Sequence, residues 1–495
     1  MIVPRWEWRT FDPGLREAAA TLLQHRSGAD YQSDELYFLS PGGENVKLRD
    51  GLIDIKVLRQ VNADGLEQWV PVMKAGFPLS AADAAKVFTA LHAWTSPAGP
   101  PSYTLDQFLE TIARIPVPIR TVKAHKLRRR CTTGTVMAEV SEIVADGRAT
   151  QTIALEGEDD AAVIAAVRDL GLEPWVNTSY SKGLAALVEG SPACYAVIDV
   201  GTNSVKFHLA ERYAGGSWRT VADRAEMTRL GEGLDDSGRI GLAPLERTVA
   251  AIAGMVEDAK AHGARAIVAV GTAGLRIAAN SREALDAIRT RAGVAVEVIS
   301  GEEEGHLAYI GVQSGLAFGQ GSLVVFDSGG GSSQFTFGDG SRVAERFSVD
   351  VGAVRYTERF GLAEAVPPER LARALDAIGA DLSRISRQPR PDRLVGMGGA
   401  VTNMAAVKHG LATYDPGVVH GSVLDRAEID RQIELYRSKD ADERRSIVGL
   451  QPNRADVILA GACIVRTVME KLGRDEFTVS DHGLRHGVLV TRFGR

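Results

Sequence analysis

Hydrophobic and polar positions alternate in two different ways along the chain, and the change divides it into two parts. Up to about residue 160, short segments show the two-residue period of strands that have one polar face. Residues 46–57 form two such segments around Asp50 and Gly51, a pair typical of a tight hairpin turn. Residues 138–156 repeat this arrangement around Asp146 and Gly147. The first part is therefore predicted to be an antiparallel sheet or barrel.

From about residue 193 onward, apolar runs alternate with helical periodicity. Residues 195–199, 266–270 and 323–327 each predict a buried strand, and residues 244–262 have the spacing of an amphipathic helix. Alternating strands and helices predict an α/β layer architecture. Residues 426–450 are predicted to be helical, with charges on a solvated face. Glycine and proline between 171 and 192 favour a linker, which we assign to residues 176–192.

Two strand-to-turn segments, residues 195–209 and 323–337, share one organisation. In each, an apolar strand ends in an aspartate, a glycine follows two positions later, and hydroxyl residues precede a second alternating strand. Glycine lets the backbone approach a ligand closely, and consecutive N–H groups in such a turn can bind an anion. One such turn is weak evidence, but two with matched flanks predict a duplicated domain with a phosphate loop in each half.

Specific residues carry this prediction. Asp199 and Asp327 are candidate ligands of Mg²⁺ or another divalent cation, because such ions prefer oxygen ligands. The candidate phosphate-binding residues of the two turns are Gly201, Thr202, Asn203 and Ser204, and Gly329, Gly330, Gly331, Ser332 and Ser333. Arg276, just past the strand at 266–270, is a further candidate for binding phosphate, with a surface arginine as the alternative.

Glu304 is the candidate catalytic residue. It lies in the first turn of a predicted helix that begins after Ser300, where Ser300 and Glu303 have the spacing of a capping box. The residues three, four and seven positions beyond Glu304 are Leu307, Ala308 and Gly311. This face is small and apolar, so Glu304 should point inward. A carboxylate directed at a phosphate cleft can serve as a general base.

Basic residues recur on the strands of the first part. If these strands close into a barrel, a cationic interior could bind a polyanion; a solvated basic face is the alternative. The candidate residues are Lys47, Arg49, Lys56, Lys74, Lys126, Arg128 and Arg130.

Composition excludes several classes of protein. The chain has 495 residues, too many for one core, and a net charge of −6, which argues against nucleic-acid binding through overall charge. No run of eighteen apolar residues predicts a membrane span, and the first residues are unlike a signal peptide. Three scattered cysteines favour reduced thiols over a disulfide framework. A cytoplasmic enzyme without a membrane role is the expectation.

The second part resembles the exopolyphosphatase / guanosine-pentaphosphate phosphohydrolase (Ppx/GppA) family. The similar motifs occur in order at residues 199–204, 271–276, 299–304, 327–332, 348–355, 395–400, 453–461 and 479–487. The resemblance implies the fold of the sugar-kinase/actin/heat-shock-ATPase superfamily, with two RNase-H-like lobes around a cleft. Lobe I would hold residues 193–301 and 482–495, and lobe II residues 302–481.

Residues 1–175 resemble the CYTH, or triphosphate-tunnel, family more loosely. That resemblance implies a closed β-barrel lined by Lys and Arg that holds a triphosphate or longer polyphosphate. The family's opening Glu-x-Glu-x-Lys appears here with Arg5, Glu7 and Arg9 at the three defined positions. Loss of the first acid argues against hydrolysis by this domain, so a polyphosphate-binding accessory domain is the preferred interpretation.

The resemblance implies an exopolyphosphatase that uses Mg²⁺ and water activated by Glu304, acting on inorganic polyphosphate. Guanosine pentaphosphate is the alternative substrate; a kinase and a non-catalytic polyphosphate or alarmone sensor are further alternatives. Gln334 stands where the family usually has Glu, which would change metal binding. The helical C-terminal extension of longer relatives is absent, and the basic barrel could replace it. The resemblance also allows a homodimer.

Overall fold

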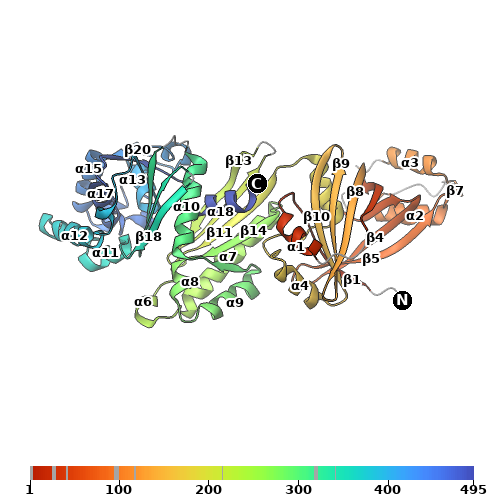
Figure 1. Cartoon of the computed structure of the whole chain (residues 1–495), viewed down its shortest axis with the longest axis horizontal. Helices are drawn as coiled ribbons and strands as arrows, with labels where there is room; N and C mark the ends of the chain where they lie inside the picture. Colours follow the sequence, from red (N-terminus) through yellow and green to blue (C-terminus); the bar gives the residue numbers. More distant parts are fainter. Residues whose placement is uncertain are drawn as a thin grey trace.

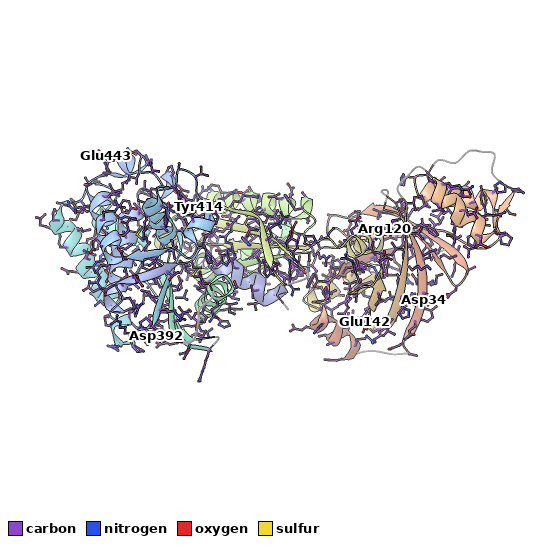
Figure 2. All side chains as sticks on the ribbon, turned by 90° about the horizontal axis from the view of Figure 1, so that it is seen from above. Asp34, Arg120, Glu142, Asp392, Tyr414 and Glu443 are labelled. Atoms are coloured by element: carbon purple, nitrogen blue, oxygen red, sulfur yellow. The ribbon has the colours of Figure 1, made fainter. Side chains whose placement is uncertain are left out.

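A computed structural model describes residues 4–24, 29–40, 43–93, 100–115, 119–213, 216–316, 321–340 and 342–494. The molecule is elongated, with a β-barrel at one end and two α/β lobes after it (Figure 1). In Figure 2 the barrel, with Asp34, Arg120 and Glu142, lies opposite the end that carries Asp392 and Glu443. Within the described residues, no helix combines the length and apolar character needed to cross a membrane.

The first part is a closed antiparallel barrel with strand order β1-β10-β9-β8-β2-β3-β4-β5, which confirms the predicted class. Its strands are β1 (Arg5–Phe11), β2 (Tyr31–Leu39), β3 (Asn45–Arg49), β4 (Leu52–Val61), β5 (Glu67–Gly76), β8 (Arg120–Thr133), β9 (Val136–Ala145) and β10 (Arg148–Gly157). Asp50 and Gly51, and likewise Asp146 and Gly147, have positive φ, as a primed two-residue turn requires. Both predicted hairpins are therefore present.

Helices pack on the outer surface of the barrel. Helices α1 (Arg16–Gln24) and α4 (Asp160–Asp169) pack on the face that carries Trp8, Val140 and Leu155. Helices α2 (Ala81–Ala90) and α3 (Leu105–Arg114) join a short ribbon of β6 (Leu79–Ser80) and β7 (Ser102–Tyr103). The face opposite Trp8 and Val140 is the barrel interior, and its polar residues are therefore enclosed.

The predicted linker contains a helix, α5 (Tyr180–Glu189), that packs against the barrel. Tyr180, Leu184 and Val188 share a hydrophobic cluster with Tyr37 and Val122, on the same strand faces as the interior cations. Tyr180 stacks on Tyr37 with ring centroids 4.9 Å apart. Ser179 caps the helix and Gly190 ends it in the left-handed conformation, so local capping supports a helix here.

Lobe I contains a five-stranded sheet with the order β13-β12-β11-β14-β15. Its strands are β11 (Ala193–Val200), β12 (Val205–Arg212), β13 (Trp218–Glu226), β14 (Ala266–Gly271) and β15 (Val296–Val298). The helices between them are α6 (Leu234–Ser237), α7 (Leu242–Ala261), α8 (Ala273–Ile277) and α9 (Ser281–Ala292). Helix α18 (Leu484–Phe493) covers the other face of this sheet, where Val488 and Leu489 pack on Val197.

Lobe II contains a six-stranded sheet with the order β18-β17-β16-β19-β21-β20. Its strands are β16 (Ser322–Ser328), β17 (Ser333–Asp339), β18 (Arg342–Val349), β19 (Arg393–Met397), β20 (Val423–Asp425) and β21 (Glu476–Val479). Its helices are α11 (Ala353–Phe360), α12 (Pro368–Asp381), α13 (Gly399–His409), α14 (Pro416–Val419), α15 (Arg426–Arg437), α16 (Ala441–Arg444) and α17 (Ile458–Lys471), with 3₁₀ turns at Ile385–Arg387 and Pro452–Arg454.

The prediction of one helix over residues 426–450 is wrong. Helix α15 ends at Arg437, and Asp440 begins α16 with a capping box in which its side chain accepts from the Glu443 N–H. The capping signal at Asp440 competes with continuation of the helix.

Helix α10 (Gly301–Gly315) connects the sheets of the two lobes and crosses α18 at very short range. A Cβ on Gly487 would lie 1.8 Å from the Leu307 carbonyl oxygen, and one on Gly311 would lie 2.1 Å from that of Gly483. Only glycine fits where two helix backbones approach so closely. This crossing fixes α10, and with it Glu304, relative to lobe I.

The barrel also has a specific contact with lobe I. Tyr195 of β11 donates a 2.5 Å hydrogen bond to Asp12, at the end of β1, and Arg265 lies 3.6 Å from the same carboxylate. The Tyr195 ring stacks on Phe493 at 4.3 Å, beside Trp175. A buried polar bond within an aromatic cluster gives this interface a defined orientation.

Candidate active site

The first predicted phosphate turn connects β11 to β12. The Gly201 N–H donates to the Ser204 carbonyl at 3.1 Å, which closes the turn. Asp199 is 4% exposed, and its Oδ1 has no hydrogen-bond partner. Thr202 is anchored through its carbonyl, which accepts from the Gly231 N–H at 2.8 Å. The turn is thus held by backbone bonds, while the carboxylate beside it keeps one oxygen available for a ligand.

The second turn, between β16 and β17, has the same construction. The Gly329 N–H donates to the Ser332 carbonyl at 2.9 Å, and the N–H of Val354 donates to the Gly330 carbonyl. The Ser333 hydroxyl is buried and donates to the Val351 carbonyl at 2.6 Å, so this hydroxyl is already engaged. The Gln334 amide donates to the Ser332 hydroxyl at 2.9 Å.

Glu304 lies in the first turn of α10, as the periodicity predicts. Ser300 caps the helix by accepting from the Glu303 N–H at 3.1 Å. The Glu304 side chain is 18% exposed, and its Oε2 lies 3.5 Å from the Arg276 guanidinium. Arg276 is oriented by a 2.7 Å hydrogen bond to the Ile299 carbonyl. The structure therefore brings together a carboxylate and an arginine that are distant in sequence.

The charges around Glu304 come from both lobes. Burial, followed by the negative charge of Asp199, raises the pKa of Glu304 to about 7, and Asp327 acts in the same direction. Arg276 and Lys206 oppose this shift. Burial also raises the pKa of Asp327. Two carboxyl groups with raised pKa values close to a third carboxylate, in a partly buried site, are typical of a functional site.

Lys206 is a residue of this site that the sequence pattern did not predict. It is the cross-strand partner of Asp199 in the β11–β12 hairpin, and its ammonium lies 3.4 Å from Asp199 Oδ2. The pairing follows from the hairpin register, which an alternating strand pattern alone does not fix. Gly398 was also missed: a Cβ there would lie 2.3 Å from Asp327 Oδ1, so this glycine makes room for the carboxylate.

The residues present fit a divalent cation. Asp199 Oδ1 and Glu304 Oε2 are buried oxygens without a hydrogen-bond partner, and Asp327 faces the same region. Buried carboxylate oxygens without partners are costly unless a cation or proton is supplied. Hard oxygen ligands of this kind suit Mg²⁺.

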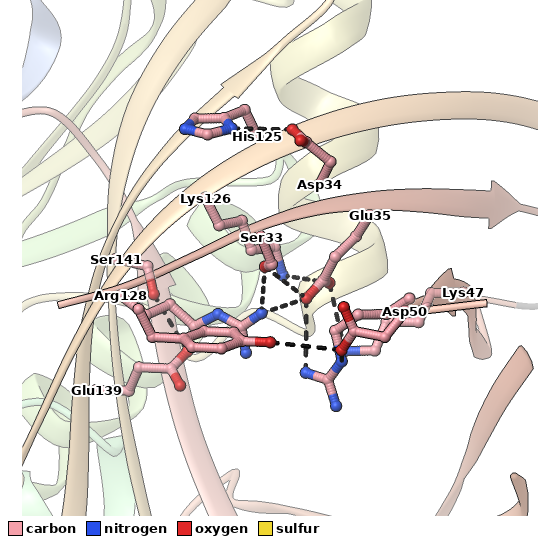
Figure 3. A network of polar contacts seen from close by, with 12 residues as sticks. Ser33, Asp34, Glu35, Lys47, Asp50, His125, Lys126, Arg128, Glu139 and Ser141 are labelled. Atoms are coloured by element: carbon pink, nitrogen blue, oxygen red, sulfur yellow. Dashed lines mark hydrogen bonds and ion pairs between the residues drawn. The ribbon is translucent and has the colours of Figure 1, made fainter. Parts of the chain in front are cut away.

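The barrel interior carries several of the predicted cations, and it also holds an acid, Glu35, that the sequence pattern did not predict there. Glu35 is fully enclosed, and its carboxylate lies 2.9 Å from Lys126, 3.5 Å from Lys47 and 3.6 Å from Arg49, with Arg128 in direct contact (Figure 3). Burial alone would raise the pKa of Glu35, but Lys126, Lys47 and the hydrogen bond from Tyr37 hold this pKa well below its usual value.

The remaining predicted barrel cations have different surroundings. Arg130 lies near the end of β8 and pairs with Glu139 at 3.1 Å. Among the described residues, Lys56 and Lys74 form no ion pair. Their strands β4 and β5 are neighbours in the barrel. These two lysines are therefore the interior cations most available to an added anion.

The Ppx/GppA phosphatase family matches residues 210–495, more than half of the chain. The chain belongs to this family. Exopolyphosphatase 2 of Mycobacterium tuberculosis is 30% identical over 323 residues, which cover 60% of this chain and 98% of that relative. Guanosine-5'-triphosphate,3'-diphosphate pyrophosphatase of Vibrio parahaemolyticus is 31% identical over 304 residues, covering 61% of this chain and 59% of that relative.

Solved structures agree with the family assignment. The Aquifex aeolicus member of the Ppx/GppA family has a TM-score of 0.55 and 32% identity, over 60% of this chain and 97% of that one. An exopolyphosphatase-like protein has a TM-score of 0.56 and 27% identity over 61% of this chain. The predicted two-lobed α/β fold is confirmed, and the closed antiparallel barrel before it fits a CYTH-like domain.

The charge of Arg276 gives a test of this electrostatic arrangement. Because Arg276 opposes the rise in the Glu304 pKa, the Arg276→Gln variant should move the acid limb of kcat/KM for phosphate release to higher pH, by roughly 0.5 to 1 pH unit. The measurement is a pH–rate profile at fixed divalent-cation concentration. Arg282→Gln, an exposed arginine on α9, is the matched control. If the acid limb of Arg276→Gln lies at the same pH as that of wild type, Arg276 does not influence the Glu304 carboxyl group as described.

Proposed function

We propose that this protein is an exopolyphosphatase, which hydrolyses the terminal phosphoanhydride bond of inorganic polyphosphate. The observation that supports this most strongly is the position of Glu304, a partly buried carboxyl group with a pKa of about 7 that faces Asp199 and Asp327. A carboxyl group with a pKa near neutrality can accept a proton from water at physiological pH. A kinase needs no such base aimed at water.

In the proposed reaction, Glu304 orients a water molecule and takes its proton as the oxygen attacks the terminal phosphorus. The bond between that phosphorus and the bridging oxygen breaks, and the shortened chain leaves with the bridging oxygen. Backbone N–H groups of the two glycine turns hold the phosphate oxygens. Arg276 and Lys206 offset negative charge next to the base. Catalysis of this type depends mainly on positioning and charge neutralisation.

A divalent cation such as Mg²⁺, held by Asp199 and Asp327, would supply further charge neutralisation when bound. Gln334 is the cross-strand partner of Asp327, and its side chain turns toward Ser332. An amide at this position offers an oxygen without a charge. We infer that the metal site relies on the two aspartates more than it would with Glu at position 334.

We favour polyphosphate over guanosine pentaphosphate because of the groups around Glu304, since the identity to the two kinds of relative is nearly equal, at 30% and 31%. The groups that surround Glu304 are charged: Asp199, Arg276, Asp327 and Lys206. Such groups recognise phosphate rather than a base. Assays with both substrates distinguish the two activities.

The Glu304→Gln variant tests the proposed base. It should lower kcat for phosphate release from long-chain polyphosphate by roughly 10²- to 10⁴-fold, because the amide cannot accept the proton. Full release in Glu304→Gln would place the base elsewhere and contradict the assignment. Glu302→Gln, an exposed acid in the same helical turn, is the matched control and should keep full activity.

The stability of the Glu304→Gln variant, compared with wild type, should change with pH. The folded-state pKa of Glu304 is raised above its ordinary value of 4.5, to about 7. Its stabilising contribution is therefore complete below about 4.5 and is lost as the pH rises through about 7. Without metal or substrate, the melting temperature of Glu304→Gln relative to wild type should rise between pH 5 and pH 8. This outcome separates lost catalysis from misfolding.

We infer that the barrel binds the distal part of a long polyphosphate chain. Lys56 and Lys74 would bind it, since Lys47, Arg49, Lys126 and Arg128 already surround Glu35. Lysines that are not paired can bind an added anion without first losing a partner.

The double variant Lys56→Gln/Lys74→Gln tests the barrel. KM for long-chain polyphosphate should rise several-fold at low salt, while kcat and the KM for tripolyphosphate should stay unchanged, because a short substrate would not reach the barrel. Steady-state assays at two chain lengths measure this. Lys260→Gln, an exposed lysine on α7, controls for net charge. If KM for long-chain polyphosphate is the same in the double variant and wild type, the barrel does not contribute to substrate binding.

A further inference from the structure

Four histidines form a continuous stack where lobe I meets lobe II. The ring of His208, on β12, lies 4.4 Å from that of His486, on α18. His486 stacks on His482 at 3.8 Å, and His482 on His420 at 4.3 Å. These residues come from a strand, a helix and two loops, and the mechanism above uses none of them.

One end of this stack has the arrangement of a metal site. His208, His486 and Asp223 each offer one ligand atom, and these atoms all lie within 4.8 Å of one another. The His208 Nδ1–H donates a 2.6 Å hydrogen bond to Asp223 Oδ2. The Arg485 guanidinium contacts the other oxygen, Oδ1, and so holds the carboxylate in place. Orientation of ligands by such surrounding bonds is a regular feature of metal sites.

We propose that His208, His486 and Asp223 bind a transition-metal ion of the zinc class, at a site separate from the proposed active site. Two imidazole nitrogens and one carboxylate oxygen are a suitable set for Zn²⁺, with water or a rotated His482 as the fourth ligand. The ion takes the place of the proton that His208 shares with Asp223, and this proton goes to solvent. Neither oxidation nor reduction is involved.

The side chains at this site offer the donor atoms that a metal of this class requires. Metal ligands must be imidazoles with a free lone pair, and the His208 and His486 rings lie 4.4 Å apart with Asp223 beside them. The hard-oxygen group at Asp199 and Asp327 suits Mg²⁺, whereas the nitrogen-rich group at His208 suits a softer ion.

Packing alone does not account for the stack. A buried imidazole has two ring nitrogens that need partners. His482 Nδ1 and His420 Nε2 are buried without a hydrogen-bond partner, and both lie close to Gly315. Rotation of His482 toward an ion on His486 would give its Nδ1 a ligand role. The unsatisfied nitrogens and the pre-oriented His208–Asp223 pair are independent observations that favour a bound ion.

The position of the stack links it to the proposed catalytic helix. Gly315 ends α10, whose first turn holds Glu304, and a Cβ at Gly315 would lie 2.3 Å from His482 Nδ1. An ion on His208 and His486 would tie the β12–β13 hairpin to α18, which crosses α10. Metal binding should therefore stabilise the frame that holds Glu304, without taking part in hydrolysis.

The experiment uses the untagged full-length protein after removal of metal with a chelator. Zn²⁺ is titrated in competition with a chromogenic chelator, and Co²⁺ is added separately to record visible absorption. We expect one tight equivalent of Zn²⁺, an intense absorption band typical of four-coordinate Co²⁺, and a melting temperature raised by several degrees. His208→Gln and His486→Gln should each lower the Zn²⁺ affinity at least about tenfold.

Two controls locate the ion. His409→Gln, an exposed histidine at the end of α13, should bind Zn²⁺ as wild type does, and Asp327→Asn should keep the tight equivalent. Circular dichroism checks that each variant is folded. Failure of wild type to bind a tight equivalent would overturn the proposal. So would binding that survives in folded His208→Gln and His486→Gln but is lost in Asp327→Asn, which would place the ion at the aspartates.

Discussion

The close crossing of α10 and α18 is the constraint on which the proposed active site depends. Helix α10 leaves lobe I after β15 and enters lobe II before β16, so it belongs to both. The glycines at 311 and 487 let its backbone lie directly against α18. Backbone-to-backbone packing leaves little freedom to shift. Its first turn, with Glu304, is therefore held at a fixed place relative to lobe I.

The proposed chemistry requires three carboxylates to lie close together beside helix α10. Burial and the charge of Asp199 raise the pKa of Glu304, burial raises the pKa of Asp327, and Asp199 Oδ1 and Glu304 Oε2 have no hydrogen-bond partner. Bringing like charges together costs folding free energy, which the surrounding packing must offset. Lys206 and Arg276 reduce the cost only in part. The arrangement is explained if the site is completed by a cation and an anionic substrate.

The barrel also brings like charges together, and it stabilises them with an acid of opposite charge. Lys126 and Arg128 are enclosed, and Glu35 beside them neutralises part of their charge (Figure 3). Helix α5 closes over this network with Tyr180, whose ring lies 3.7 Å from the Lys126 ammonium. The helix also lies between the barrel and β11 in the chain, and the Tyr195–Asp12 hydrogen bond forms a second connection between the barrel and lobe I.

Local patterns predict much of this structure, and the rest depends on long-range contacts. The two primed hairpins, the phosphate turns and the inward position of Glu304 follow from turn residues and periodicity. The role of Lys206 could be predicted only from the register of the hairpin. The role of Glu35 could be predicted only from the closed barrel, because strands distant in sequence surround this residue. The Ser333 hydroxyl donates to the carbonyl of Val351, eighteen residues away, and a local pattern does not predict this hydrogen bond. The stack of histidines could not be predicted, since its members lie on separated elements.

The most direct test of the central claim is hydrolysis of long-chain polyphosphate in ¹⁸O-labelled water. The proposed attack of water on the terminal phosphorus predicts that each phosphate released carries one ¹⁸O atom, while the remaining polymer shortens one residue at a time from its ends. Release of internal fragments, or phosphate that carries no label, would contradict the account.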